Sequence, residues 1–238
     1  MIPHKLTLCL LLFLFDPNTI IAQQRKPPTG GRLAVVVDEH LAALRATPQL
    51  NGKLVRRLSR GRLIAIRSSK TSADGITFFL VNVSSRTHGW IQRDAVASPS
   101  GRGDDRRLLT LIQRSDGFDR VARARIFLDN FPRSPLRPEV LLLLGDTAES
   151  LAAKLSLDAA RRLKDDLGDA PEFTYYLNYT GLDRYNRQGI SFVFNKTTKR
   201  FHYDGATWRE LVRRYPKTLQ AAEAKKRMTL LYSQLRTE

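Results

Sequence analysis

The spacing of apolar residues changes near residues 98–105, and this change divides the sequence into two parts. Before it, short runs rich in β-branched and aromatic residues alternate with polar ones, as in strands that bury one face. After it, apolar residues recur every three or four positions, as in amphipathic helices. The stretch between them, SPSGRGDD, is rich in turn-forming residues, so we expect a linker over residues 98–103. The sequence therefore predicts a multidomain α+β protein.

The first part, residues 32–97, predicts a small β-barrel. Turn-forming residues separate its expected strands, and residues 53–68 alternate around a turn at Gly61. The expected strand regions are residues 32–39, 53–68, 77–84 and 88–96. Several short strands within about 65 residues are typical of a small barrel, because closing the sheet removes its unpaired edges.

The second part, residues 104–238, predicts a mainly α-helical domain. The expected helices lie at residues 104–115, 118–131, 134–166, 206–215 and 217–235. The third is long for one helix, and we expect Gly145 or Ser156 to bend or divide it. Alternating apolar and polar residues around a polar turn predict a β-hairpin insert near residues 190–203.

The N-terminus predicts export. Lys5 precedes an unbroken apolar run over residues 6–15, and Ala22 stands at a suitable cleavage point. This pattern is typical of a secretory signal peptide over residues 1–22, followed by a linker over residues 23–31. The alternative is a membrane anchor, but this run is far shorter than the roughly 20 residues that a spanning helix needs. We expect an exported protein that is periplasmic or associated with the cell envelope.

The formal charge of +17 predicts attraction to polyanions. Cleavage after Ala22 would remove Lys5 and Asp16 together, so the charge would persist. Outside the cytoplasm the available polyanions are anionic lipids and wall polymers, and we expect no nucleic acid partner. Between Lys53 and Arg67 lie six basic residues and no acid, which form either a solvated strand face or a binding patch.

The first part resembles the bacterial SH3 (SH3b) domain. The resemblance is carried by the segments LAALRATPQLNGKLVRRLSRGRLIAI, FFLVNV and HGWIQRDAV. The residues at the motif positions are Leu41 or Leu44, Arg45, Gly52, Leu58, Gly61, Val83, Gly89, Trp90 and Ile91. This resemblance implies an SH3-like β-barrel that binds wall peptide, with Arg45 and Trp90 as candidate ligand-binding residues. The alternative for Trp90 is a place in the barrel core.

Two stretches of the helical part echo each other at an offset of 84 residues, NFPRSPLRPEV and RYPKTLQAAEA. In each, an aromatic residue ends a helix, proline prevents its continuation, and a hydroxyl residue caps the next helix. The matched pairs are Phe131 with Tyr215, Pro132 with Pro216, and Ser134 with Thr218. These joints resemble tetratricopeptide (TPR)-like repeats of BamD- and YbgF-type envelope proteins, and the stretch LLGDTAESLA adds to the likeness. The resemblance implies a protein partner for the helical part.

The sequence contains no recognisable catalytic constellation. Its one cysteine, Cys9, lies inside the predicted signal peptide, so the mature chain would have no thiol nucleophile. His40, His88 and His202 lie far apart in the sequence and form no metal-ligand motif. A G-x-S-x-G motif is absent too. We therefore expect no enzyme activity, no metal and no cofactor.

The segment YYLNYTGLDRYNRQG is the other candidate site. Its aromatic rings and guanidinium groups suit sugar or peptide recognition. The candidate residues are Tyr175, Tyr179, Arg184 and Tyr185, together with Tyr176 and Arg187. The same spacing suits the packing face of a helix against the hairpin.

Together these features predict a non-catalytic, exported bacterial envelope protein that acts as a binding or scaffolding module. Its expected partners are peptidoglycan, bound by the barrel, and envelope proteins, bound by the helical part. Its basic surface is a further candidate for binding anionic lipid or wall polymer. The alternative is a cell-wall hydrolase with a dispersed active site near residues 175–187.

Overall fold

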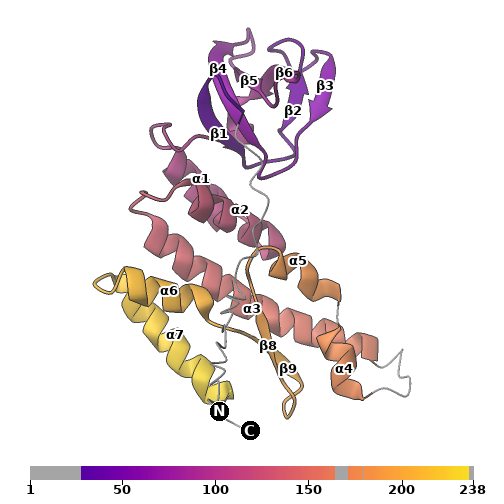
Figure 1. The fold of residues 1–238 in the computed structure, drawn as a ribbon, viewed down its shortest axis with the longest axis vertical. Coiled ribbons are helices and arrows are strands. Elements are labelled where there is room, and N and C mark those ends of the chain that lie inside the picture. Colours follow the sequence, from indigo (N-terminus) through magenta and orange to yellow (C-terminus); the bar gives the residue numbers. More distant parts are fainter. Residues whose placement is uncertain (1–27, 164–170, 179, 236–238) are drawn as a thin grey trace, which may run out of the picture.

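The computed structural model describes residues 28–163, 171–178 and 180–235. The predicted signal peptide and residues 23–27 of the predicted linker lie outside this part. A β-sheet formed by the first third of the chain stands at one end, and helices with a small hairpin form the rest (Figure 1). The coarse prediction of an α+β protein, with strands first and helices after them, is confirmed.

The first part forms one seven-stranded sheet, and every strand pair in it is antiparallel. The strands are β1 (Arg32–Val36), β2 (Ala43–Arg45), β3 (Leu54–Arg57), β4 (Leu63–Thr71), β5 (Thr77–Asn82), β6 (His88–Gln92) and β7 (Val96–Ala97), with a 3-10 turn, η1 (Arg93–Ala95), before β7. Their order in the sheet is β3-β2-β6-β5-β4-β1-β7. The predicted turn at Gly61 is found between β3 and β4, which do not pair with each other, and Gly61 has a φ of +79° there. Such a φ favours glycine.

The last three residues of strand β1 and the following Val37 are buried on both faces of the strand, which explains the continuous apolar sequence there. Ala34 and Val36 face the sheet's own core, together with Ile64. Val35 and its downstream neighbour Val37 belong instead to the core that the helices form. The sheet and the helices are therefore joined by a shared apolar layer.

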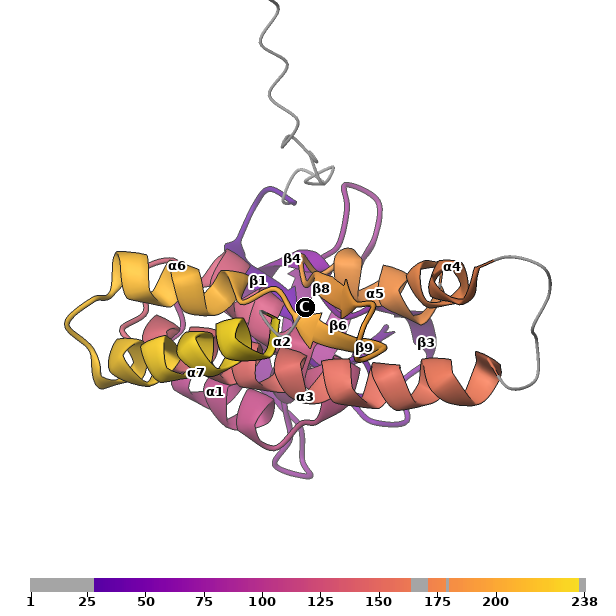
Figure 2. The same ribbon diagram turned by 90° about the horizontal axis from the view of Figure 1, so that it is seen from below.

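The second part is built of helices and one hairpin. In order these are α1 (Asp104–Gln113), α2 (Gly117–Asn130), α3 (Arg137–Leu163), α4 (Glu172–Leu177), the 3-10 turn η2 (Thr180–Leu182), α5 (Asp183–Asn186), β8 (Phe192–Asn195), β9 (Arg200–Tyr203), α6 (Ala206–Arg214) and α7 (Leu219–Leu235). The hairpin predicted near residues 190–203 is confirmed as β8–β9. It lies alongside α3, between the α6–α7 pair and α4 (Figure 2).

Helix α3 runs through 27 residues without interruption, so neither Gly145 nor Ser156 divides it. Both residues serve its packing instead. A Cβ at Gly145 would lie 2.3 Å from Nε1 of Trp208, so only glycine lets α6 approach this closely. Ser156 Oγ accepts the N–H of Phe201 at 2.8 Å, and Glu149 Oε2 accepts the N–H of Tyr203 at the same distance. Side chains of α3 thus satisfy the outer edge of β9, as a neighbouring strand would.

The two helical joints share their backbone geometry. The N–H groups of Phe131 and Tyr215 each donate to a carbonyl four residues earlier at 2.9 Å, and so close the preceding helix. The N–H groups of Ser134 and Thr218 then donate to the Phe131 and Tyr215 carbonyls, at 3.2 and 3.1 Å. Pro132 or the corresponding Pro216 follows each aromatic residue and prevents continuation of the helix. The repeat seen in the sequence is therefore a repeat of structure.

The joints differ in what their hydroxyl residues do. Thr218 Oγ1 accepts the N–H of Ala221 at 3.2 Å and caps α7 as expected. Ser134 Oγ accepts the N–H of Leu136 at 3.2 Å and donates to Asp105 at 2.7 Å, so it ties the joint to α1.

Arg137 connects the two joints. It is 7% exposed, and its Nη1 donates to the Leu128 carbonyl at 2.6 Å. Its Nε donates to the Tyr215 hydroxyl of the second joint at 3.1 Å. A guanidinium can make both bonds at once because its donors form a fixed fork. The two joints are thus held side by side at the start of α3.

Arginines also join the sheet to the helices. Arg60, in the turn before β4, donates to Asp119 of α2 at 2.8 Å and to Glu39 at 3.1 Å. This hydrogen bond from Arg60 lowers the pKa of Asp119 below its ordinary value. Arg123 of α2 is buried and donates to the Val37 carbonyl at 3.3 Å. The sheet part thus contributes Arg60 to the contact with the helices, and the helical part contributes Arg123.

The predicted linker begins with hydrogen bonds to both parts. Ser98 Oγ donates to the Leu33 carbonyl at 2.6 Å, while its N–H donates to Asp104 at 2.8 Å. Arg107 of α1 donates to the Val96 carbonyl. The sheet and the first helix are consequently held in a defined arrangement.

The contact between Gly145 and Trp208 predicts an inverted effect of Gly145→Ala. In the interior of a helix this change would ordinarily stabilise by about 1 kcal/mol. Here the added methyl group collides with a buried indole, and such overpacking costs about 1–3 kcal/mol. We expect the free energy of unfolding, measured by urea denaturation, to fall. Ser150→Ala, at an exposed position of the same helix, serves as the control and should not lower it. A gain in stability for Gly145→Ala would contradict the packing.

Candidate functional site

The two candidate residues of the sheet, Arg45 and Trp90, face each other across β2 and β6. On its other side Arg45 pairs with Leu54 of β3, and Trp90 pairs with Leu80 of β5. Directly paired residues of an antiparallel sheet lie on the same face. We call the four residues Leu54, Arg45, Trp90 and Leu80 the outer row, because all of them retain solvent exposure. The sequence-predicted pair is thus brought together on an accessible face.

Within the outer row, Arg45 and Trp90 have different roles. The Nη1 of Arg45 donates to the Gly52 carbonyl at 2.8 Å and so holds the loop between β2 and β3. A Cβ at Gly52 would lie 2.4 Å from Thr47 Oγ1, which accounts for the glycine in this tight loop. Trp90 is partly exposed, and an indole on a sheet surface offers apolar area together with a hydrogen-bond donor. Arg45 therefore positions the site, and Trp90 is its candidate contact residue.

The six basic residues from Lys53 to Arg67 fall into two groups. Arg60 is engaged by Glu39 and Asp119, and Arg62 donates to the Val83 carbonyl at 3.1 Å. The other four are exposed: Lys53, Arg56, Arg57 and Arg67. The segment thus contains both structural arginines and a solvated basic strand.

Structural arginines recur throughout the molecule, and sequence reasoning missed them. Their guanidinium groups donate to backbone carbonyls, mostly of turns and helix ends. The residues that do so are Arg45, Arg62, Arg107, Arg120, Arg123, Arg125, Arg137 and Arg209. A formal charge of +17 therefore overstates the charge that is free to attract a ligand.

The tyrosine–arginine segment is largely packed. Tyr185 is 1% exposed and meets the rings of Phe118 and Phe192 edge to face, with centroids 5.5 and 5.6 Å away. Arg184 donates to the Tyr185 hydroxyl at 2.8 Å, and its guanidinium carbon lies 5.3 Å from the centre of the Phe118 ring. This geometry favours a packing face for the segment.

The other tyrosines of the segment differ in how far they are buried. Tyr175 is partly exposed, and Tyr179 lies outside the described residues. Tyr176 is 3% exposed and stacks on Phe194 of the hairpin, with ring centroids 4.5 Å apart. Its burial at the position next to Tyr175 follows from helical spacing.

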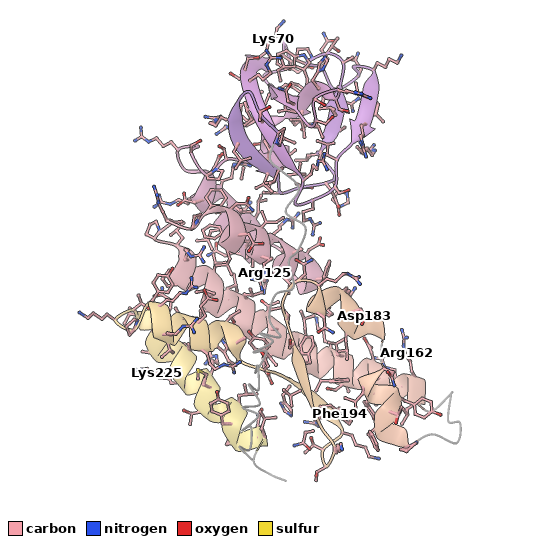
Figure 3. The ribbon with its side chains drawn as sticks, viewed as in Figure 1. Lys70, Arg125, Arg162, Asp183, Phe194 and Lys225 are labelled. Carbon is pink, nitrogen blue, oxygen red and sulfur yellow. The ribbon has the colours of Figure 1, made fainter. Side chains whose placement is uncertain are left out.

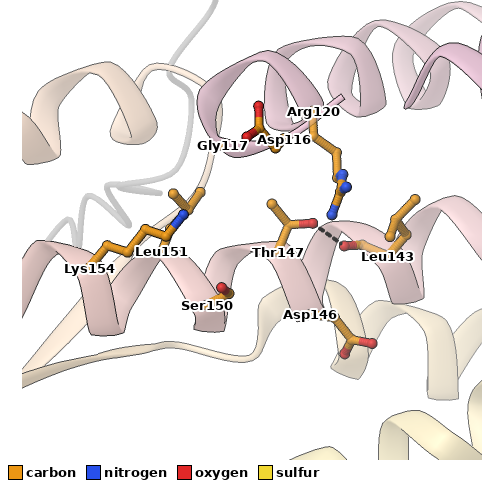
Figure 4. Close-up of a pocket in the computed structure, with 9 residues that line it drawn as sticks. All are labelled: Asp116, Gly117, Arg120, Leu143, Asp146, Thr147, Ser150, Leu151 and Lys154. Atoms are coloured by element: carbon orange, nitrogen blue, oxygen red, sulfur yellow. Dashed lines mark hydrogen bonds between the residues drawn. The ribbon is translucent and has the colours of Figure 1, made fainter. Parts of the chain in front are cut away.

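A cavity of about 160 Å³ lies between α2 and α3 (Figure 4). Its lining residues are Asp116, Gly117, Arg120, Leu143, Asp146, Thr147, Ser150, Leu151 and Lys154. Several of its polar groups are already bonded. Thr147 Oγ1 donates to the Leu143 carbonyl at 2.7 Å, and Arg120 donates to carbonyls at the end of α1. Asp146 pairs with Arg227 of α7 at 3.3 Å. The cavity is better explained by packing between the helices than by ligand binding.

The three histidines among the described residues stay apart. His40 is exposed in the turn before β2 and His88 is exposed in β6, while His202 lies 3.5 Å from Glu149, measured from Nδ1 to Oε1. In the described ranges, no three His, Cys, Asp or Glu side chains are grouped so that they would hold a metal ion. None of the helices in these ranges is both long and apolar enough to cross a membrane.

No known protein family, curated protein or solved structure matches the chain. The candidate site is therefore defined by geometry alone. Of the predicted site residues, the structure pairs Arg45 with Trp90, both of them partly exposed, and packs Tyr185 into the core.

The packing of Tyr185 predicts a stability effect at this position. Replacing a buried aromatic residue with alanine typically costs about 3–5 kcal/mol, and we expect Tyr185→Ala to fall in this range. Tyr185→Phe keeps the ring and loses one hydrogen bond, worth about 1 kcal/mol. Leu177→Ala, at a 54% exposed position nearby, serves as the control and should change the free energy of unfolding by less than about 0.5 kcal/mol. If Tyr185→Ala left thermal unfolding unchanged, the packing interpretation would be wrong.

Proposed function

We propose that this protein is a non-catalytic, exported envelope protein that binds wall peptide through the sheet and a protein partner through its helical part. The observation that carries the proposal is the outer row, in which an accessible tryptophan lies beside an arginine-braced loop. Rigid aromatic side chains next to polar groups are frequent at peptide-binding surfaces. The SH3b-like motif positions and the predicted signal peptide agree with this function.

The helical part supports a scaffolding role. Its two joints have one geometry and are bonded to each other through Arg137. Helix α3 carries α6, α7 and the hairpin along its length. Such an assembly presents helix surfaces in a fixed arrangement, which suits recognition of a folded protein. The TPR-like character of the joints belongs to the same proposal.

The hydrolase alternative is less favoured. It requires free chemical groups near residues 175–187, but the Tyr185 ring is buried and Arg184 is engaged by Tyr185 and Phe118. A general acid or base must reach the substrate with its reactive atom. The geometry of this segment favours packing.

Retention of the mature chain on purified peptidoglycan tests the wall-binding half. At physiological salt we expect retention, and we expect Trp90→Ala to weaken it about tenfold, since tryptophan is frequent among residues that dominate binding energy. Tyr232→Ala, which removes a 40% exposed aromatic residue of α7, is the matched control and should retain wild-type binding.

Three results would count against the proposal. Loss of retention at moderately raised salt would indicate adsorption by charge alone. Equal retention of the wild type and Trp90→Ala would remove the outer row from the site. Release of soluble wall fragments during incubation would favour the hydrolase.

A further inference from the structure

Strand β3 is exposed to an unusual degree. It ends the sheet, with β2 as its only neighbour in the strand order (Figure 1). All of its residues are exposed, including Leu54 at 47% and Val55 at 49%. Adjacent residues of a strand point to opposite faces, so neither face of β3 is covered. An uncovered edge strand with large apolar side chains is a template for pairing with another chain.

The backbone of β3 is available on its outer side. Toward the sheet, the N–H of Leu58, just after β3, donates to the Ala42 carbonyl at 2.9 Å. Because bonding directions alternate along an antiparallel ladder, the N–H and C=O of Arg57 point away from β2. The register shift opposite Leu44 and Arg45 is a feature that proteins use to protect an edge. Protection alone does not explain why Leu54 and Val55 stay exposed.

The charge around β3 indicates what kind of chain would pair with it. Lys53, Arg56 and Arg57 are exposed and contiguous with the apolar pair. Arg60, which follows β3 in the sequence, already engages two acids, Glu39 and Asp119. A second copy of the protein would place arginines against arginines, and the charge of +17 opposes self-association. An acidic partner has neither disadvantage.

We propose that β3 binds an extended acidic segment of a protein partner, which pairs with its outer edge as an eighth strand. Backbone hydrogen bonds provide the pairing, Leu54 and Val55 contact apolar side chains of the segment, and Lys53, Arg56 and Arg57 pair with its carboxylates. This inference rests on the proposed function, since it names a partner class and a surface for a binding protein. It places that surface at β3, whose first residue, Leu54, also belongs to the outer row.

Fluorescence anisotropy with synthetic peptides tests the proposal on the whole chain that follows the predicted signal peptide. The probe alternates glutamate and valine over about ten residues, enough to cover an ordinary strand. We expect it to bind about tenfold more tightly than the same peptide with lysine in place of glutamate. N-methylation of alternate backbone nitrogens on the pairing edge should weaken it about tenfold, because the hydrogen bonds to β3 are lost.

Matched charge variants locate the site. The double variant Arg56→Glu with Arg57→Glu should abolish binding. The double variant Arg67→Glu with Lys70→Glu changes the net charge equally on the exposed end of β4, and should bind within about threefold of the wild type. Lys70 lies at the end of the sheet away from the helices (Figure 3). Circular dichroism of both variants confirms that any loss of binding is not a loss of folding.

Several outcomes would overturn the inference. Equal binding of the N-methylated and unmethylated probes would indicate charge attraction without strand pairing. Equal loss of probe binding in both charge variants would indicate a diffuse basic surface. Binding of both variants to phosphatidylglycerol vesicles in preference to the probe would assign that surface to lipid. Wall retention that depends on Trp90, without probe binding, would overturn this inference and leave the proposed function intact. Probe binding without wall retention would support this inference and overturn the wall-binding half of the proposed function.

Discussion

The close approach of Trp208 to Gly145 fixes much of the helical part. Because glycine lets the buried indole lie directly on α3, helix α6 is held at one position along it. That position brings the Tyr215 hydroxyl within 3.1 Å of Arg137, so the second joint is bonded to the first. The hairpin that precedes α6 then lies where Glu149 and Ser156 accept its outer N–H groups. One small residue in a long helix thus determines where the C-terminal elements stand.

Arginine has two roles in this protein, and only one of them concerns ligands. Arg60 and Arg123 join the sheet to α2, and Arg137 joins the two helical joints. A guanidinium suits these places because its charge persists and its several donors satisfy carbonyls that would otherwise be buried without partners. The basic side chains left for binding are those that stay exposed, among which Arg56 and Arg57 lie on the open edge of the sheet.

Much of the fold could be predicted because it depends on local patterns. The hairpin near residues 190–203 and the joints at Pro132 and Pro216 follow from alternation, turn residues and helix stops. Tertiary choices could not be predicted in this way. Gly145 was expected to bend or divide the long helix, since glycine weakens helices locally, but contact with Trp208 favours it there. Likewise, composition cannot show which arginines bond to carbonyls. The pairing of Arg45 with Trp90 was outlined by motif positions, whereas the burial of Tyr185 was one of two open alternatives.

The central claim, that the outer row is the wall-peptide site, can be tested with the two tryptophans of the chain. Trp90 is partly exposed on the sheet, and Trp208 is buried against Gly145. Labelling with 5-fluorotryptophan gives one ¹⁹F NMR signal for each ring, so the protein carries its own internal control. On titration with soluble wall peptides, the Trp90 signal should shift to saturation while the Trp208 signal stays unchanged. An unchanged Trp90 signal, or a shift confined to Trp208, would contradict the account.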